Sequence, residues 1–342
     1  MPHIGIIGAG NIGSTIYAYL KKKYKNIAIA DQRTGNNIEL VNFSNTKELT
    51  QFIADKDLII NAGPYHYNRN IVDICFHKNI AYFDLTEDVE VTNYIKSFDY
   101  QSALLAPQCG LAPGAINIIA SDLASKLDEV YKLKLRVGAL PRFVSNEMSY
   151  YLTWSTEGLI NEYCNPCDTL YQGKLVKAQP LDGLENIFID GIQYEAFNTS
   201  GGVATMCETY ADKVQDLNYK TIRYPGHCEK MKFLLNDLNL KSNKKTFVDL
   251  FNQDVPYTTD DVVVIFVSAQ GKIGDRLQEL TYTQKVYGDS DYSAIQKTTA
   301  GGVCSIVNLY VDDKIQQTGF LNQENVSFAD FTSNTYGSIY SI

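Results

Sequence analysis

Three glycines near the start of the chain, Gly8, Gly10 and Gly13, follow the apolar run Ile4–Ile7 in the spacing G-x-G-x-x-G. In this spacing the first glycine permits a tight strand-to-helix turn, and the second lets the backbone approach a pyrophosphate. The third lets the next helix pack close to the strand, and that helix would direct its N-terminus at the anion. The segment therefore predicts a dinucleotide-binding strand-turn-helix unit.

A second apolar run, residues 27–30, ends at Asp31, where a ribose-binding acid is expected in such a unit. A carboxylate there accepts hydrogen bonds from a free ribose 2′-hydroxyl and repels a 2′-phosphate. Arg33 is interpreted as a solvated loop charge, although an arginine in this place can also hold a phosphate. The sequence thus predicts NAD as cofactor and leaves NADP open.

The composition is that of an ordinary globular protein. With 342 residues and 45% hydrophobic content, the chain can bury a substantial core in one or two domains. No apolar run has the length of a membrane span and no secretory pattern is visible, so we expect a cytoplasmic protein without a membrane partner. The net charge is −9 and the basic cluster Lys21-Lys22-Lys23 is short, so no nucleic-acid partner is expected.

Seven cysteines show no regular framework, and their odd number favours reduced thiols. Cys164 and Cys167 form the one close pair. Zinc would need a second pair, or histidines at matching spacing. No metal site is therefore expected.

The first third of the chain alternates strands with helices, which predicts a parallel, doubly wound Rossmann sheet. Strands are expected at 38–42, 58–61, 81–84 and 104–106, with helices at 46–53 and 68–78. Ligands bind at the carboxyl ends of such strands. The loops there place Asn61, Ala62, Gly63, Asp84 and Gly110 among the candidate site residues.

From about residue 130 the pattern changes to long strands joined by hairpins, with a two-residue turn signal at Asp190-Gly191. Strands at 262–269 and 277–287 flank a turn, and helices are expected at 157–163, 227–238 and 246–251. A late helix at 301–313 is expected to return to the first sheet. We therefore predict an α/β protein with a dinucleotide-binding domain, 1–118 plus 295–342, and an α+β mixed-sheet domain, 119–294.

Six segments, 8–13, 110–117, 155–163, 197–202, 220–227 and 298–302, resemble the saccharopine dehydrogenase family, and within it the lysine 6-dehydrogenases. The resemblance implies a Rossmann domain closed by the C-terminal segment and a second, sheet-based domain for substrate binding and dimerisation. It also implies a homodimer or higher homo-oligomer. The implied activity is NAD(P)-dependent oxidation of an amino acid at a carbon that carries nitrogen.

Within this family, the resemblance implies that glutamate-forming saccharopine dehydrogenases carry arginines in the segments matching 155–158 and 197–202. Here these segments contain Glu157 and no arginine. Glu157 suits a substrate ammonium, although it also fits an acidic residue in the first turn of a helix. We predict oxidative deamination of the L-lysine ε-amine. The alternatives are a glutamate-forming saccharopine dehydrogenase and, more remotely, a non-catalytic nucleotide-binding dimer.

Four further side chains are interpreted one by one. Arg223 is expected to hold the substrate carboxylate, with a surface ion pair as the alternative. His227 is a candidate for proton transfer, or a helix cap. Asp84 is a candidate polar contact at the reacting centre, or a turn cap, and Tyr65 is expected to line the nicotinamide pocket.

The full set of candidates falls into three groups. The catalytic candidates are Asp84 and His227. The substrate-binding candidates are Tyr65, Trp154, Glu157, Thr199, Ser200 and Arg223. The cofactor-binding candidates are Gly8, Gly10, Asn11, Ile12, Gly13, Asp31, Asn61, Ala62, Gly63 and Gly110.

Overall fold

The computed structural model describes residues 1–98 and 103–342. The chain divides into two compact units. Unit 1 contains residues 1–118 and 296–342, and unit 2 contains residues 119–295. Two helices, α5 (Ala115–Ser125) and α10 (Ala294–Val311), each contain one of the points where the chain passes between units.

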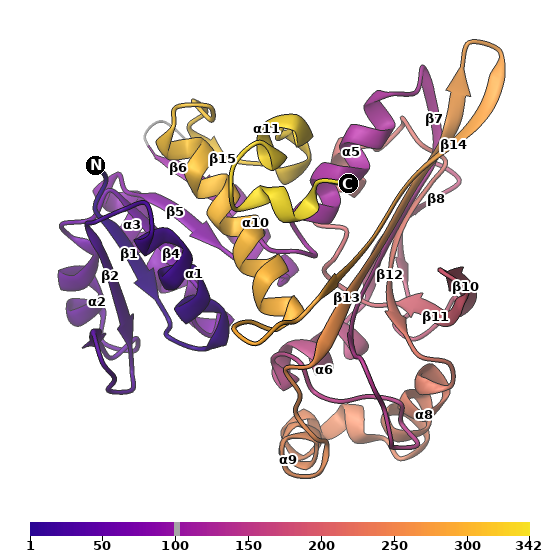
Figure 1. Ribbon diagram of the computed structural model, residues 1–342, viewed down its shortest axis with the longest axis horizontal. Coiled ribbons are helices and arrows are strands. Elements are labelled where there is room, and N and C mark those ends of the chain that lie inside the picture. Colours follow the sequence, from indigo (N-terminus) through magenta and orange to yellow (C-terminus); the bar gives the residue numbers. More distant parts are fainter. Residues whose placement is uncertain (99–102) are drawn as a thin grey trace. The chain divides into compact units, whose positions relative to one another are not determined.

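Unit 1 is built on a seven-stranded sheet in the order β15-β6-β5-β4-β1-β2-β3 (Figure 1). Its pairs are parallel, which confirms the predicted doubly wound sheet. The central strands β1, β4 and β5 are buried at every residue, as a parallel sheet covered on both faces requires. The strands are β1 (Ile4–Ile7), β2 (Ile27–Asp31), β3 (Ile38–Leu40), β4 (Leu58–Asn61), β5 (Ala81–Asp84), β6 (Leu104–Ala106) and β15 (Gly319–Phe320).

The helices of the first half of unit 1 are α1 (Asn11–Lys21), α2 (Thr46–Ile53), α3 (Asn68–Lys78) and α4 (Val89–Lys96). Helices α2 and α3 have the predicted bounds. Helix α4 was not predicted, because its eight residues include β-branched side chains and its pattern is short. The Asp88 side chain caps this helix by accepting the backbone N–H of Val91 at 2.7 Å. Helix α4 provides the crossover that the parallel pair β5 and β6 needs.

Helices α1 and α10 run side by side (Figure 1). The Lys23 ammonium, just beyond α1, donates to the Asn308 side chain at 2.6 Å and pairs with Asp312 at 3.1 Å. The Tyr24 hydroxyl donates to the same Asn308 oxygen at 3.2 Å. Lys23 and Tyr24, which follow the end of α1, thus hold α10 in place. Helix α10 begins earlier than the predicted residue 301.

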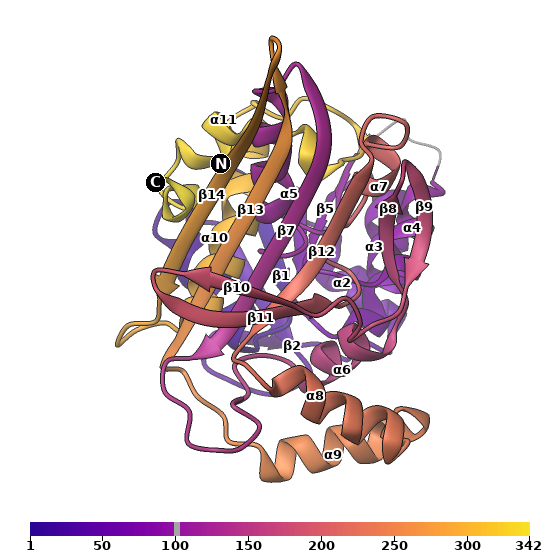
Figure 2. The same ribbon diagram turned by 90° about the vertical axis from the view of Figure 1, so that its right-hand side faces the viewer.

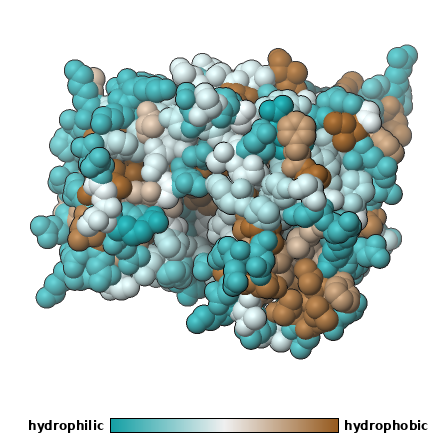
Figure 3. All heavy atoms as spheres, turned by 60° about the horizontal axis from the view of Figure 1, so that its bottom comes forward, coloured by the Kyte–Doolittle hydropathy of each residue, from teal (hydrophilic) through white to brown (hydrophobic). Residues whose placement is uncertain are grey.

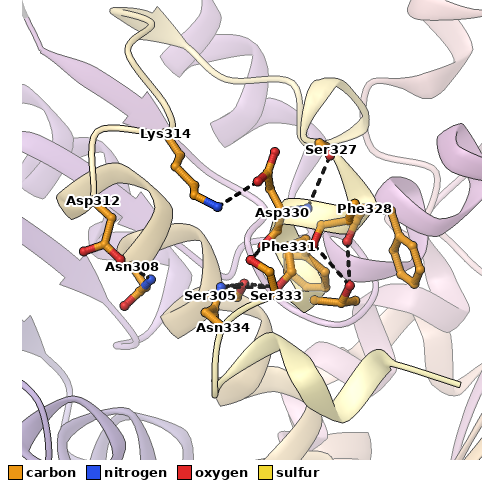
Figure 4. Close-up of polar contacts among 12 residues, drawn as sticks. Ser305, Asn308, Asp312, Lys314, Ser327, Phe328, Asp330, Phe331, Ser333 and Asn334 are labelled. Atoms are coloured by element: carbon orange, nitrogen blue, oxygen red, sulfur yellow. Dashed lines mark hydrogen bonds and ion pairs between the residues drawn. The ribbon is translucent and has the colours of Figure 1, made fainter.

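The C-terminal segment packs on α10 through a small hydrogen-bond network (Figure 4). The Ser305 hydroxyl donates to the Phe331 carbonyl at 2.6 Å and accepts from the Asn334 side chain at 2.8 Å. Lys314 pairs with Asp330 of α11 (Phe328–Thr332) at 2.8 Å. These contacts make the last residues of the chain part of the core of unit 1.

Unit 2 contains an eight-stranded sheet with the path β10-β11-β12-β7-β13-β14, and β8 and β9 attach to β12 (Figure 2). Strands β12 and β7 pair in parallel and the other pairs are antiparallel, so the mixed sheet is confirmed. Asp190 and Gly191 form the predicted turn, with φ of 52° and 75°. The strands are β7 (Glu129–Pro141), β8 (Cys167–Tyr171), β9 (Lys174–Ala178), β10 (Glu185–Ile189), β11 (Ile192–Asn198), β12 (Asp216–Arg223), β13 (Asp261–Ile273) and β14 (Arg276–Tyr287).

A helical layer in unit 2 consists of α6 (Thr156–Cys164), α8 (His227–Lys232) and α9 (Lys244–Asp254), with the short helix α7 (Met206–Thr209) elsewhere in the unit. The predicted helix at 227–238 becomes a π-helical turn from Phe233. The layer has its own core, formed by Tyr150, Leu152, Leu159, Ile160, Tyr163, Leu181, Phe197, Cys228, Met231, Leu235, Phe247 and Phe251. Apolar side chains also gather on its outside, where Phe233 and Leu238 are half exposed (Figure 3).

No helix in the described parts of the chain is both long and apolar enough to cross a lipid bilayer.

Candidate functional site

The three glycines of the first loop have different surroundings. Gly8 has a φ of 96°, and a Cβ there would lie 2.6 Å from the backbone nitrogen of Gly63. A Cβ on Gly13 would overlap the carbonyl oxygen of Gly8. A Cβ on Gly10 would meet nothing within 4 Å. Gly8 and Gly13 therefore serve the close packing of the loop, whereas Gly10 leaves open space in front of the backbone.

The N-terminus of α1 suits an anion. No side chain caps this helix at Gly10, and its first turn contains no acidic residue. Helix α2, by contrast, is capped by Asn45, which accepts the backbone N–H of Lys47 at 3.1 Å. Uncapped N–H groups and the positive end of the helix dipole favour a bound phosphate. The loop thus fits the pyrophosphate of a dinucleotide, with the backbone of Asn11 and Ile12 at its edge.

Asp31, at the end of β2, is tied into this loop. Its carboxylate accepts the backbone N–H of Ala9 at 2.7 Å, the backbone N–H of Arg33 at 2.9 Å and the Arg33 Nε–H at 3.1 Å. Burial acts to raise the pKa of Asp31, but the hydrogen bonds from Arg33 and Ala9 outweigh it and lower the pKa. Arg33 is exposed, as interpreted, yet it pairs with Asp31. The carboxylate and the guanidinium therefore form one ion pair at the end of β2.

A buried chain of amides leads from the loop after β4 to the end of β5. Asn61 accepts the backbone N–H of Gly63 at 3.1 Å and donates to the Asn68 side chain at 2.7 Å. Asn68 donates in turn to Asp84 at 3.2 Å, and the Tyr82 hydroxyl donates to the same Asp84 oxygen at 2.8 Å. The predicted residues Asn61 and Asp84 thus belong to one network, which fixes the loop that carries Ala62 and Gly63.

Asp84 is fully buried and its second carboxylate oxygen is also used. This oxygen accepts the backbone N–H groups of Thr86 and Gln108, each at 3.0 Å. Burial raises the pKa of Asp84 to about 6, although these hydrogen bonds act in the opposite direction. The geometry supports the turn-capping interpretation of Asp84, and its catalytic role stays a prediction.

Gln323, which the sequence did not single out, holds the loop after β6. Its amide donates to the Pro107 carbonyl at 2.9 Å and to the Cys109 sulfur at 3.2 Å. Burial raises the pKa of Cys109, so this side chain is a packed thiol. Gly110 follows directly, and a Cβ on it would lie 3.3 Å from the Pro113 carbonyl. No local sequence pattern marks Gln323, because its partners are more than 200 residues away.

In unit 2, Arg223 ends β12 and is 2% exposed. Its Nε donates to the Tyr163 hydroxyl at 2.8 Å and its Nη1 to the Ile222 carbonyl at 2.8 Å. Its Cζ lies 5.3 Å from the ring centroid of Tyr150 and 5.8 Å from that of Tyr163. Arg223 is therefore not the surface ion pair considered as an alternative.

The charge of Arg223 has no direct counterion in the structure. Within residues 1–98 and 103–342, no carboxylate oxygen lies within 4.0 Å of its guanidinium nitrogens, although Glu162 contributes a favourable interaction from further away. Buried charges are normally paired, because an isolated ion in a low-dielectric interior is costly. Arg223 is thus poised to receive an anion.

His227 begins α8 and is fully buried beside Arg223. Its Nδ1 lies 3.0 Å from the Met148 carbonyl oxygen, and its Nε2 lies 3.0 Å from the Tyr163 hydroxyl. Burial, and then the charge of Arg223, lower the pKa of His227 to about 3. Sequence reasoning missed Tyr163 and Tyr150, because aromatic residues in an apolar pattern suggest only core packing.

The exposed candidates are Glu157 and Tyr65. Glu157 lies in the first turn of α6, whose N-cap is Ser155, with the Ser155 hydroxyl accepting the Gly158 N–H at 3.2 Å. Tyr65 is 40% exposed in a short helical turn after β4. Contacts of Glu157 with an ammonium and of Tyr65 with nicotinamide stay predictions.

Thr199, Ser200 and Trp154 lie in or beside the helical layer of unit 2. Thr199 is 2% exposed and its hydroxyl has no hydrogen-bond partner in the described chain. Ser200 donates from its backbone to the Glu162 carbonyl at 3.1 Å, and Trp154 packs half buried against the core of the layer. Of these three, Thr199 offers a polar atom that is still unused.

No group of three or more histidine, cysteine, aspartate or glutamate side chains in the described chain is arranged to hold a metal ion.

Comparison with known proteins gives a consistent result. Residues 4–106 match the saccharopine dehydrogenase NADP binding domain, and residues 110–336 match the saccharopine dehydrogenase C-terminal domain. The fold is similar to that of apo saccharopine dehydrogenase (L-Glu forming) from Saccharomyces cerevisiae, with a TM-score of 0.76, 14% identity, and coverage of 97% of this chain and 95% of that chain.

A weaker similarity, with a TM-score of 0.49 and 12% identity, relates the chain to DAP dehydrogenase from C. glutamicum and covers 99% of this chain and 98% of that one. The two family domains, by contrast, together account for most of this chain. The protein therefore belongs to the saccharopine dehydrogenase family and is an NAD(P)-binding oxidoreductase.

Proposed function

We propose that this protein is an NAD(P)-dependent amino-acid dehydrogenase that oxidises the carbon bearing the ε-amine of L-lysine. The observation that carries the proposal is Arg223, a buried guanidinium in the family's C-terminal domain that has no directly contacting carboxylate among the described residues. An amino-acid carboxylate would supply the missing charge through charge-assisted hydrogen bonds. A substrate without a carboxylate would leave Arg223 unneutralised.

In the proposed reaction, the amine carbon loses a hydride and a proton leaves the nitrogen, which gives an imine. Water then converts the imine into an aldehyde and ammonia. The nicotinamide cofactor supplies the redox chemistry by accepting the hydride. The contribution of this chain is to bind and orient the amino acid, to exclude water around Arg223, and to favour the neutral amine by desolvation.

The number of free cations favours lysine over saccharopine. Two arginines are buried in unit 2, and one of them, Arg136, already pairs with Glu185. Arg223 is thus left for one carboxylate, whereas saccharopine carries three. The absence of arginine from residues 155–158 and 197–202 agrees with this difference. A glutamate-forming saccharopine dehydrogenase remains the second candidate, because such an enzyme shares the fold.

For the cofactor, we propose a preference for NAD over NADP. The support is Asp31, whose carboxylate is held at the end of β2 by three N–H groups and would repel a 2′-phosphate. The matched family domain is described as NADP binding, and Arg33 is near enough to Asp31 to offset part of its charge. Both cofactors therefore belong in the decisive assay.

That assay incubates the full chain with lysine or saccharopine and with either cofactor, and follows the absorbance of the reduced nicotinamide together with ammonia release. We expect reduction and ammonia with lysine. Arg223→Lys should lose most of this activity, because a lysine lacks the bidentate geometry. Arg142→Lys, at an exposed ion pair with Asp260, is the matched control. Efficient saccharopine oxidation without ammonia from lysine would establish the second candidate instead.

A further inference from the structure

The Tyr150 ring lies against the Arg223 guanidinium and carries a hydroxyl that is not hydrogen-bonded in the ordinary way. The residue is fully buried, and its oxygen makes no hydrogen bond of normal geometry in the described chain, although the Trp154 side chain lies near enough to act as a donor that lowers the Tyr150 pKa. Its ring stacks near the Arg223 guanidinium and lies 5.0 Å from the ring of His227, centroid to centroid. A buried hydroxyl without a partner costs free energy, so it is expected to have a use that the free protein does not show.

The neighbouring hydrogen bonds have fixed directions. The Met148 carbonyl can only accept, so His227 Nδ1 carries the proton and donates to it. In the neutral ring Nε2 then has a free lone pair and accepts from the Tyr163 hydroxyl. The Tyr163 oxygen in turn accepts the Nε–H of Arg223. The chain of donors runs from Arg223 through Tyr163 and His227 to Met148.

These hydrogen bonds leave one end of the Arg223 guanidinium available for a ligand. The hydrogen bonds of Arg223 within the protein use Nε and Nη1, on Tyr163 and on the Ile222 carbonyl. The Nη2 end has no partner of this kind in the described chain. Because two of the three nitrogens are fixed, the position of the third is fixed as well.

We propose that the Tyr150 hydroxyl and the free Nη2 end of Arg223 together bind one carboxylate of the substrate. Tyr163 and His227 are positioning residues in this site, since they hold the guanidinium and touch no reacting atom. The inference rests on the proposed function and deepens it by naming the carboxylate site. It also replaces the proton-transfer role considered for His227.

Protonation states agree with these assignments. Burial raises the pKa of Tyr150 to about 12, although Arg223 and Trp154 act in the opposite direction, so its hydroxyl remains a donor at neutral pH. Burial also raises the pKa of Tyr163. His227 remains neutral, because burial and Arg223 depress its pKa, with Lys230 acting in the same direction. Both nitrogens of the neutral His227 ring are already hydrogen-bonded. The ring therefore cannot take up a substrate proton unless its hydrogen bond with Tyr163 is broken.

The first test is Tyr150→Phe, which removes one oxygen and keeps the ring. The KM for lysine should rise about 10- to 100-fold, because a hydrogen bond to a charged group is lost. The kcat/KM for 1,5-diaminopentane, which lacks the carboxylate, should stay within about two-fold. Folding stability should be unchanged or higher, since an unpaired hydroxyl is removed. Equal losses with both substrates would overturn the proposal.

Tyr151→Phe is the matched control, since the Tyr151 hydroxyl bonds the exposed Ser145 side chain instead. It should leave the KM for lysine unchanged.

The positioning role has its own test in two variants of His227. His227→Gln keeps an acceptor for the Tyr163 hydroxyl, and His227→Ala does not. We expect the glutamine variant to retain at least about ten-fold more kcat/KM for lysine than the alanine variant, with an unaltered pH profile. A glutamine variant as inactive as the alanine variant, with loss of one limb of the pH profile, would make His227 a proton-transfer group.

Binding separates failure of this site from failure of the proposed function. L-norleucine carries the α-carboxylate of lysine and no ε-amine, so it can bind without reacting. The wild-type protein should be stabilised against heat by L-norleucine, and Tyr150→Phe should lose most of this effect. If L-norleucine stabilises the wild type and not Tyr150→Phe while lysine is not oxidised, the carboxylate site is supported and the proposed reaction is wrong. Equal stabilisation of both proteins, or of neither, would refute the site.

Discussion

The carboxylate of Asp84 accepts the backbone N–H of Gln108 at 3.0 Å and thereby ties the end of β5 to the loop that follows β6. Gln108 has a φ of 64°, an uncommon conformation for a residue with a side chain. The bond to Asp84 helps hold Gln108 in that conformation. The loop leading to Gly110 therefore depends on a carboxylate that is itself fully buried.

This arrangement predicts a stability effect with a definite sign. The pKa of Asp84 is raised from 3.8 to about 6, so the folded state binds the proton more tightly than the unfolded state. The stabilisation is fully present below pH 4 and is lost as the pH rises to 6, by about 1.4 kcal/mol per pKa unit at most. Asp84→Asn should remove this slope in denaturant titrations from pH 4 to pH 7. Identical pH dependence in the variant would refute the raised pKa.

A second prediction concerns Asp31 and Arg33. Asp31→Ser should reduce the preference for NAD over NADP, because it removes a 2′-hydroxyl acceptor and frees Arg33 for a phosphate. Arg33→Ala in the Asp31→Ser background should then weaken NADP binding by about 1 to 2 kcal/mol, the value of a charge-assisted contact near the surface. Titration of both cofactors into the wild type, the Asp31→Ser and Arg33→Ala single variants and the double variant measures the coupling. A wild-type protein that binds NADP more tightly would contradict our interpretation of Asp31.

His227 predicts acid sensitivity of the fold. Its pKa is lowered to about 3, whereas an unfolded histidine titrates near 6.5, so between these values the unfolded state binds the extra proton. The contribution of His227 to stability is therefore lost as the pH falls from 6.5 towards 3. His227→Gln should flatten the pH dependence of the unfolding free energy in this window. His66→Gln, on a short turn of unit 1, is a control with an exposed ring and should leave the dependence unchanged.

The close packing around Gly337 predicts that the C-terminal segment contributes to the free energy of unfolding. A Cβ at this position would overlap the Phe331 carbonyl oxygen and lie 2.7 Å from the Ser305 hydroxyl. Gly337→Ala should therefore cost about 1 to 3 kcal/mol, as overpacking does in other cores. Ser338→Ala, next to it at an exposed hydroxyl, should cost much less. Equal melting temperatures of the two variants would show that the segment packs loosely.

The sequence was sufficient for those parts of the fold that depend on local pattern. Helix α2 is amphipathic, and α3 ends at Asn79 in the left-handed conformation. The apolar runs of β1, β4 and β5 are four residues long, which is too short for a helix and favours buried strands. Helix α4 was missed, since its eight residues are few for a periodic signal. The π-helical turn at Phe233 was missed as well, because its sequence is equally compatible with an α-helix.

The candidate site was predictable only in part, for a different physical reason. The three glycines and Asp31 belong to one local motif, so their spacing in the sequence is enough to predict a dinucleotide-binding loop. The environment of Arg223 depends on Tyr163, 60 residues earlier in the chain, and on Tyr150. The residues next to Arg223 in the sequence do not show that its guanidinium is buried against two aromatic rings. An arginine in a surface loop could have the same local sequence.

Gly10 has a further consequence for how this chain can vary. At Gly8 and Gly13 a side chain would overlap neighbouring backbone atoms. Almost any replacement there therefore destabilises the fold, whether or not a dinucleotide is bound. At Gly10 the space in front of the Cα is open, and the fold alone is indifferent to an alanine there. In a protein that no longer binds a cofactor, substitutions at position 10 would be tolerated, whereas the other two glycines would still be required for folding. Of the three glycines, Gly10 is thus the one at which a replacement reports on cofactor binding and not on folding.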